Sequence, residues 1–291
     1  MAVALPFACL VLAACGDDEK IAAPKDPVKA RTATEKDFDP KGNFAAATRV
    51  DNRWNPLVPG TQLVYDGRSN RGLGQLPHRV IVTVTGLTKR IEGVDTVVVF
   101  ERDINEKRLS EAEITFAAQD DDGTVWNFGE YPEEYADDGS FDGAPSTWLS
   151  GSRDARAGIV MRGDPRPGTP SYLQGDAPKI GFGDTSKILK FQRRECVPVG
   201  CHANVLVIDE TNPLSPGDGH QLKYYASGVG TISVAPGRGG KEREVLELVK
   251  LRKLRPKTLA KLQRDALRLD RRAYRTVPKV WGSSERVKLA S

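Results

Sequence analysis

The feature that most constrains the fold is a succession of short strand-like runs, separated by turn residues, between residues 53 and 251. The run RVIVTVTGL at residues 79–87 alternates valine with isoleucine and threonine, so the two sets occupy opposite faces of a strand. Similar runs occupy residues 95–103, 112–119, 124–130, 187–193, 203–210, 220–227, 230–236 and 243–251. Most connections are of hairpin length, and no convincing crossover helix separates the runs. The pattern therefore predicts an all-β fold, with one antiparallel domain built as a curved sheet, a barrel or a sandwich.

Charge is distributed unevenly along the 291 residues. Of the 43 Lys and Arg and the 39 Asp and Glu, residues 241–291 contain 16 and 6, which leaves 27 and 33 for residues 1–240. The end of the chain is therefore strongly basic and the rest mildly acidic. Together, the uneven charge and the strand pattern predict that the chain has four parts. They are a lipoprotein signal peptide (1–14), a lipidated cysteine and disordered tether (15–51), an antiparallel β domain (52–254), and a basic amphipathic helix and tail (255–291).

An apolar run, MAVALPFACLVLAA, occupies residues 1–14 and is too short to span a membrane. The following LAAC, which ends at Cys15, resembles the lipobox of bacterial lipoproteins, where the signal peptide is removed before the cysteine and the cysteine is acylated. This resemblance implies that Cys15 anchors the protein on the extracytoplasmic side of a membrane in the bacterial cell envelope. The alternative is that Cys15 is a small apolar residue at the end of a discarded signal peptide.

A helix is predicted after Pro256, because Leu259, Leu262, Ala266, Leu269 and Ala273 recur every three or four residues. Its other faces carry the cations Lys261, Arg264, Arg268, Arg271, Arg272 and Arg275. Two hypotheses remain open: these cations contact anionic lipid or a cell-wall polymer, or the apolar seam docks onto the β domain and leaves them in solvent. Nucleic acid is not expected as a partner of an exported, lipid-anchored protein, and we expect a monomer.

Cys196 and Cys201, in CVPVGC between two predicted strands, predict a structural disulfide. No metal site or cofactor is predicted, since the three histidines (His78, His202 and His220) are far apart in the sequence. Calcium could be held by Asp120, Asp121 and Asp122, but the EF-hand pattern requires Glu at the twelfth position, which is Tyr131, so a hairpin turn is favoured. Nucleophile-elbow and Walker motifs are absent from the sequence.

Residues 129–180 have mostly turn chemistry, which is typical of a functional or poorly ordered loop. Its acidic residues are Glu130, Glu133, Glu134, Asp137, Asp138 and Asp142. Two of them could act as the acid and base of a glycoside hydrolase, or they could simply be solvated. Tyr131, Tyr135 and Trp148, together with Phe141, could stack on a glycan, or they could fix the loop to the domain.

Several segments resemble a family of uncharacterised bacterial envelope proteins, whose small all-β domains are often found on lipoproteins. These segments are NPLVPGT, VYDG, AQDDDGTVWNFGE, YYASGVGTIS and EVLELVKL, and the resemblance covers about residues 55–251. It implies a fold and a location but no catalytic residues. We therefore expect a membrane-anchored envelope lipoprotein with a non-enzymatic binding or structural role. The alternatives are a carrier of an apolar ligand within a β cavity and a carbohydrate-active enzyme that uses carboxylates of residues 129–180.

Overall fold

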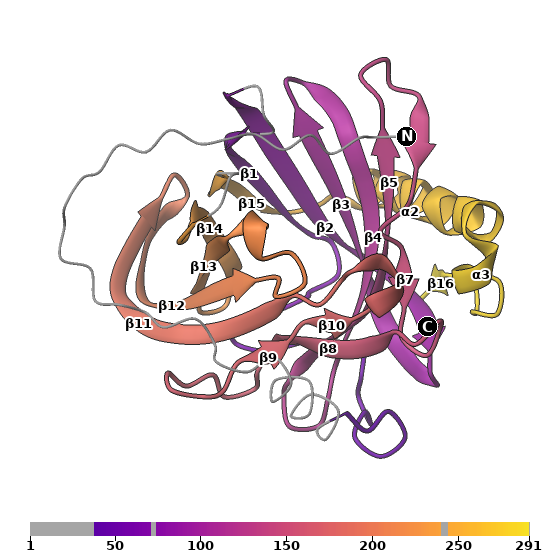
Figure 1. Cartoon of the computed structure of the whole chain (residues 1–291), viewed down its shortest axis with the longest axis horizontal. Helices are drawn as coiled ribbons and strands as arrows, with labels where there is room; N and C mark the ends of the chain where they lie inside the picture. Colours follow the sequence, from indigo (N-terminus) through magenta and orange to yellow (C-terminus); the bar gives the residue numbers. More distant parts are fainter. Residues whose placement is uncertain (1–37, 71–73, 240–243, 291) are drawn as a thin grey trace.

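The computed structural model describes residues 38–70, 74–239 and 244–290. In these residues sixteen strands form one antiparallel sheet that curls strongly but does not close (Figure 1). The all-β prediction is confirmed in its curved-sheet form. The signal peptide, Cys15 and most of the predicted tether lie outside the described residues.

Ten strands form the two arms of the sheet. The first arm consists of β1 (Thr61–Asn70), β2 (Gln75–Ile91), β3 (Val94–Asn105), β4 (Arg108–Gln119) and β5 (Val125–Tyr135). The second arm consists of β11 (Thr185–Val197), β12 (Gly200–Thr211), β13 (His220–Ala226), β14 (Gly230–Pro236) and β15 (Val245–Lys253). Each arm is a meander of neighbouring hairpins, and β1 joins the arms by pairing with β15. The curl brings the second arm round to face the first (Figure 1).

Short strands, two 3₁₀ helices and two α-helices complete the described residues. They are β6 (Phe141–Gly143), β7 (Trp148–Leu149), β8 (Arg156–Met161), β9 (Tyr172–Leu173), β10 (Gly175–Asp176), η1 (Pro178–Ile180), η2 (Pro216–Asp218), α2 (Pro256–Thr276), α3 (Pro278–Trp281) and β16 (Lys288–Leu289). Six of these elements, β6 to β10 and η1, lie in or directly after the segment predicted to be a long loop. That segment is therefore ordered, and β5 itself continues to Tyr135. No helix of the described residues is long and apolar enough to cross a membrane.

The helix α2 covers the outer face of the first arm (Figure 1). Its seam residues Leu262, Ala266, Leu269 and Ala273 are buried in the main hydrophobic cluster. In α3, the fully buried Trp281 places its ring centroid 5.6 Å from that of Phe116 and 5.3 Å from that of Tyr131. The predicted helix and seam are therefore present, and the seam docks onto the β domain.

The tether prediction is wrong for residues 38–51, because they pack against the domain. The Phe38 ring lies 5.1 Å from that of Trp126 and 5.6 Å from that of Phe128. Ala47 and Val50 are buried in the same cluster. The segment contains too few apolar residues for a core of its own, but it adds them to a core that the sheet and α2 already form.

Two buried carboxylates fasten α2 to the sheet. Asp270 of α2 accepts a hydrogen bond from Lys89 Nζ of β2 at 3.0 Å, and both residues are at most 1% exposed. Glu133 of β5 is fully buried and accepts from Arg272 Nη1 at 2.8 Å. The seam and these ion pairs together make the helix part of the domain.

Candidate functional site

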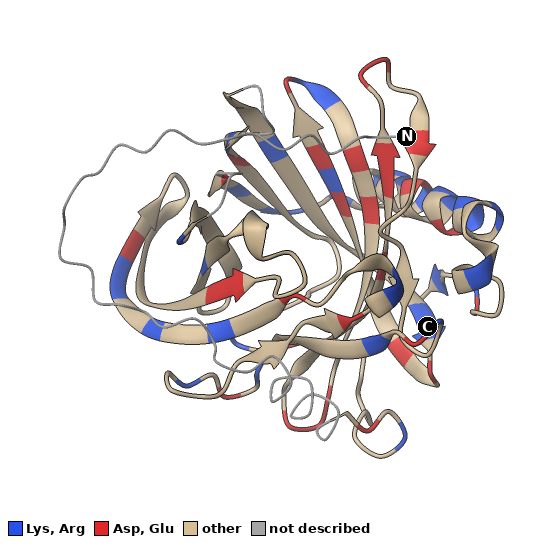
Figure 2. Cartoon of the chain, in the orientation of Figure 1, with Lys and Arg blue, Asp and Glu red and all other residues tan. Residues whose placement is uncertain are grey.

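Three glutamates form a row across the inner face of the first arm, the face turned away from α2. Glu101 of β3 lies directly opposite Glu113 of β4. Glu130 of β5 lies opposite Thr115, which is the next residue of β4 on the same face as Glu113. Side chains alternate along a strand, and Tyr131 packs on Trp281 on the helix side, so Glu130 points to the inner face. We call Glu101, Glu113 and Glu130 the acidic row; acidic positions on β3, β4 and β5 are the red bands in Figure 2.

The three glutamates of the acidic row are half-buried, and their surroundings raise their pKa values. Burial raises the pKa of Glu101 to about 7, and repulsion from Glu111 adds to the shift. Burial raises the pKa of Glu130 to about 8, with Asp184 adding to it. The pKa of Glu113 is also well above its usual value, again through burial and then through Glu130. Acidic side chains opposite one another on neighbouring strands repel when ionised, so this face is costly to keep charged.

A single lysine of the second arm faces this row. Lys223 of β13 makes an ion pair of 2.6 Å with Glu210 of β12. Burial alone would lower the pKa of Lys223, but Glu210, Tyr225 and Asp184 raise it above its usual value. Lys223 lowers the pKa of Glu101 somewhat. It is nevertheless already neutralised by Glu210, and no ion pair of Glu101, Glu113 or Glu130 is found among the described residues.

A cavity of about 520 Å³ is lined mainly by the second arm and its connections, and no residue of the acidic row is among the described residues that line it. Its carboxylates are Asp184, Glu210 and Glu244, and none of the described residues lining it is lysine or arginine. Asp184 raises the pKa of Glu130, and Glu244 raises that of Glu101, so the cavity wall and the row act on each other electrostatically. The mouth is partly apolar, because Ile180, Phe182 and Pro236 line it.

Trp148 lies beside Glu130. It pairs with Glu130 across β5 and β7, is 2% exposed, and stacks on Phe182 with ring centroids 5.2 Å apart. The indole N–H of Trp148 is directed at the Glu130 carboxyl group and lowers its pKa, which partly offsets the effect of burial.

The acidic residues that could supply a hydrolase pair are divided between the two faces of β5 and an exposed turn. Glu130 faces inward, whereas Glu133 faces α2 and accepts hydrogen bonds from Tyr131 Oη at 3.0 Å, Tyr135 Oη at 2.6 Å and Arg272. Glu134 follows Glu130 on the inner face of β5, opposite Glu111. The others, Asp137, Asp138 and Asp142, are exposed. Opposite faces of one strand cannot place Glu130 and Glu133 on the same bond of a substrate.

The proposed glycan-stacking residues do not form a surface. Tyr131 is fully buried and Trp148 is 2% exposed, so neither ring is available to a sugar. Tyr135 is half-buried, with its hydroxyl on Glu133. Phe141 is exposed, but its ring lies 5.0 Å from the Arg272 guanidinium. The alternative is correct for Tyr131 and Trp148, which pack into the domain.

The cations of α2 have two different environments. Arg272 is turned toward the sheet and bound to Glu133. The others are exposed, and with Lys257 they form a line along the solvent side of the helix at intervals of three or four residues, which we call the cationic stripe. Its members are Lys257, Lys261, Arg264, Arg268, Arg271 and Arg275. Asp265 pairs with Arg268. In Figure 2 the outer side of α2 is marked by blue bands.

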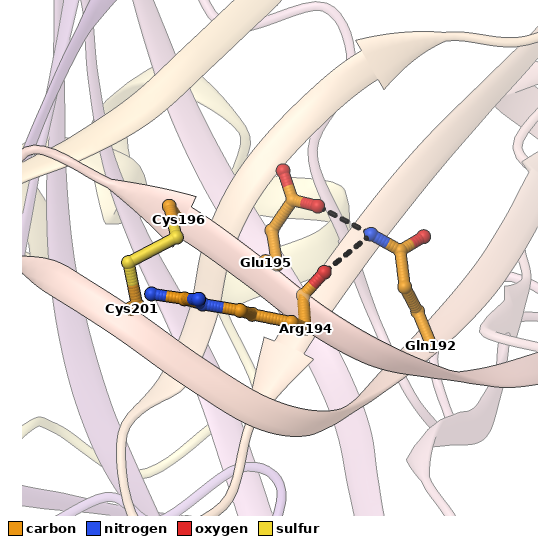
Figure 3. Close-up of a disulfide and its surroundings, with 5 residues drawn as sticks. All are labelled: Gln192, Arg194, Glu195, Cys196 and Cys201. Carbon is orange, nitrogen blue, oxygen red and sulfur yellow. Dashed lines mark hydrogen bonds between the residues drawn. A yellow bond between two sulfur atoms is a disulfide. The ribbon is translucent and has the colours of Figure 1, made fainter.

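Two further predictions concern turns. The disulfide between Cys196 and Cys201 is confirmed: the two residues lie directly opposite each other in the β11–β12 hairpin (Figure 3). At the β4–β5 turn, Asp120 Oδ1 accepts from the Thr124 backbone N–H at 2.7 Å and Oδ2 accepts from Trp126 Nε1 at 2.8 Å. Both oxygens of Asp120 therefore serve the hairpin, whose Gly123 has a φ of 81°.

The histidines stay separate in space as in sequence. His78 Nδ1 lies 2.7 Å from Asn105 Oδ1 and its Nε2 lies 2.8 Å from Glu244 Oε1, whereas His220 Nδ1 lies 2.9 Å from Asp209 Oδ1. In residues 38–70, 74–239 and 244–290, no three His, Cys, Asp or Glu side chains converge to hold a metal ion.

No protein-family model and no curated protein matches this chain. Two solved structures are similar to 69% of it, and the similarity covers 100% of each of their chains. One is a protein of Bacteroides fragilis inferred to be exported, with a YmcC-like fold, at 10% identity and a TM-score of 0.40. The other is a protein of Parabacteroides distasonis inferred to be a lipoprotein, at 12% identity and a TM-score of 0.36.

Proposed function

We propose that the protein is a bacterial envelope lipoprotein, anchored through an acylated Cys15, whose cationic stripe lies on the anionic headgroups of the same membrane. Its role is binding or structural rather than enzymatic. The observation that carries this proposal is the straight line of six exposed cations opposite the buried seam of α2. A cation near an anionic membrane surface contributes about 1 kcal/mol, and an acyl anchor holds the helix within reach of that surface.

The alternative function, a carrier of an apolar ligand, has less support among the described residues. Such a carrier needs a hollow lined mainly by apolar side chains. The cavity of about 520 Å³ is instead lined mainly by polar side chains, among them Asp184, Glu210 and Glu244. An apolar ligand there would displace water from these carboxylates without offering them a hydrogen bond in return.

Replacing Cys15 by serine is expected to move the protein from the membrane fraction to the soluble extracytoplasmic fraction. Serine cannot accept the thioether-linked diacylglycerol, and the remaining charge attraction is weak and reversible. Fractionation of cells that express either full-length chain measures the result, with Cys196→Ala as a thiol control that should stay membrane-bound. Retention of the Cys15→Ser protein after a high-salt wash would contradict the anchor.

Reversing the charge of the stripe is expected to weaken membrane binding by at least 100-fold. At about 1 kcal/mol for each cation, Lys261→Glu, Arg264→Glu and Arg271→Glu together remove about 3 kcal/mol, and each 1.4 kcal/mol corresponds to tenfold. Binding of the acyl-free Cys15→Ser protein to vesicles containing phosphatidylglycerol measures the effect. Vesicles of phosphatidylcholine alone and added salt should both weaken binding of the unreversed stripe.

The matched control carries the same change of charge elsewhere. Lys190, Arg193 and Arg194 are exposed on β11, and their replacement by glutamate should leave vesicle binding nearly unchanged. Equal losses in the two triple variants would mean that net charge rather than the stripe determines binding. Deletion of residues 256–291 is not a suitable test, because it removes the buried seam from the core.

A further inference from the structure

We propose that a second cavity, which we call the basic cavity, binds the phosphate group of a small phosphate ester that carries hydroxyl groups. The proposal depends neither on the lipid anchor nor on the cationic stripe. It rests on three cations that the fold brings to one cavity, on the scarcity of acidic partners for them, and on one buried acceptor beside them.

The basic cavity lies where three segments that are distant in the sequence meet. These are residues 40–48, the end of the β2–β3 hairpin, and β16. Its volume of about 520 Å³ is within the usual range of roughly 300–1,000 Å³ for small-molecule sites. The charged residues among those described that line it are Lys41, Arg90, Lys288 and Asp95. The surplus of positive charge favours an anion as the ligand.

The register of the strands explains how the cations come together. Lys288 of β16 lies directly opposite Thr88 of β2, so their side chains share a face of the sheet. Side chains alternate along β2, so Arg90 lies on the face of Thr88, whereas Lys89 points to α2 on the other face. Residues 40–48 line the same cavity and add Lys41. The folded chain therefore assembles a group of cations that no single segment contains.

The three cations are available to a ligand. Lys41 and Lys288 are exposed, and no ion pair of either is found among the described residues. Arg90 donates from Nε to the Gly93 carbonyl oxygen at 3.1 Å, which holds the guanidinium in place. Its two terminal nitrogens have no hydrogen-bond partner in the part of the chain that the structure describes. A guanidinium binds phosphate through paired hydrogen bonds, and lysines add charge at further oxygens.

Asp95 favours an ester with hydroxyl groups over a bare phosphate ion. Its Oδ1 is buried and has no hydrogen-bond partner among the described residues, since Arg90 Nε lies 3.6 Å away, too far for a hydrogen bond. Unsatisfied buried acceptors are uncommon in proteins, and a ligand hydroxyl would satisfy this one. Because phosphate and carboxylate repel each other, the hydroxyl-bearing part of the ligand should lie against Asp95 and the phosphate against the lysines.

Titration calorimetry of the full-length Cys15→Ser protein with glycerol 3-phosphate at pH 7 tests the proposal. We expect saturable binding, about tenfold tighter than that of inorganic phosphate, because the glycerol hydroxyls reach Asp95 while the phosphate stays on the cations. Absence of saturable binding would overturn the proposal. Equal or tighter binding of inorganic phosphate would overturn the choice of an ester.

Substitutions of the cations locate the binding. Lys41→Gln, Arg90→Gln and Lys288→Gln each remove one charge from an exposed side chain, so the fold should persist and glycerol 3-phosphate should bind about tenfold more weakly. The matched controls Lys190→Gln and Arg193→Gln remove the same charges from exposed positions of β11 and should leave binding unchanged. Equal losses in the controls would indicate diffuse attraction to positive charge and would refute the site.

A change at Asp95 tests the specificity. Asp95→Ala removes the acceptor and also a negative charge, so inorganic phosphate should bind more tightly and the preference for glycerol 3-phosphate should disappear. A preference that persists in this variant would refute the contact between Asp95 and the ligand hydroxyl.

The same chemistry occurs in a soluble phosphate ester and in the headgroup of phosphatidylglycerol, and vesicle binding distinguishes the two sources. The acyl-free protein with all three cavity cations replaced by glutamine keeps the cationic stripe. Weaker binding of this variant to phosphatidylglycerol vesicles, with competition by glycerol 3-phosphate against the unchanged cavity, would identify the headgroup as the ligand. Vesicle binding equal to that of the unchanged cavity, with glycerol 3-phosphate binding lost, would identify a soluble ester. Charge reversal of the stripe tests the proposed function separately, because it leaves the cavity cations in place.

Discussion

Replacing Asp270 by alanine is expected to lower the free energy of unfolding by about 3–5 kcal/mol. The carboxylate of Asp270 is 1% exposed and accepts hydrogen bonds from Lys89 Nζ at 3.0 Å, Trp281 Nε1 at 3.0 Å and the Val287 N–H at 3.2 Å. Removal of one partner of a buried ion pair leaves the other charge without compensation, here a lysine that is fully buried. Urea unfolding at pH 7, followed by circular dichroism, measures the difference.

A matched control lies on the same helix. Asp265 pairs with Arg268 at the protein surface, and such pairs contribute only about 0–1 kcal/mol, so Asp265→Ala should unfold at nearly the same urea concentration as the unchanged chain. A second variant, Lys89→Met with Asp270→Leu, should recover part of the lost stability, because it removes both buried charges and keeps apolar volume but leaves the N–H groups of Trp281 and Val287 without their acceptor. Equal effects of Asp265→Ala and Asp270→Ala would show that the buried pair does not hold the helix.

The sequence allowed prediction of the long strands, the hairpins, the disulfide and the C-terminal helix, because each depends on local pattern. Alternation in β2 and the three- and four-residue spacing in α2 are properties of one segment. The two-residue strands β7, β9 and β10 are too short for any periodicity. Their pairing depends on the long strands beside them, so residues 129–180 were predicted to be a loop.

The candidate site depends on register, which the sequence does not give. Glu101 and Glu113 are twelve residues apart in the sequence, and only the pairing of β3 with β4 places them opposite each other. The sequence did contain one indication that Glu130 and Glu133 lie on opposite faces of a strand. Tyr131, Glu133 and Tyr135 alternate with Glu130 and Glu134, which would have placed the two acids on opposite faces had the strand been extended beyond residue 130.

Raising the pH from 5 to 8 is expected to lower the free energy of unfolding. The folded-state pKa values of Glu101, Glu113 and Glu130 lie above the unfolded value of 4.5. Between about pH 4.5 and 8 the folded state therefore binds more protons than the unfolded state, and stability falls as the pH rises. Burial lowers the pKa of His78, but Glu244, Asp103 and Asn105 together raise it above its usual value, and this group acts in the same direction above pH 6.5.

Neutral variants identify the source of this pH dependence. The double variant Glu101→Gln with Glu130→Gln should be more stable than the unchanged chain at pH 8 and equally or less stable at pH 5, because an amide cannot ionise. Its slope should be shallower but not zero, because Glu113 and His78 still titrate. Asp137→Asn, which changes a fully exposed carboxylate, should leave the slope unaltered. Urea unfolding at half-unit intervals of pH measures all three proteins. A stability that rises from pH 5 to 8 in the unchanged chain, or an equal slope in the double variant, would mean that the row does not produce the pH dependence.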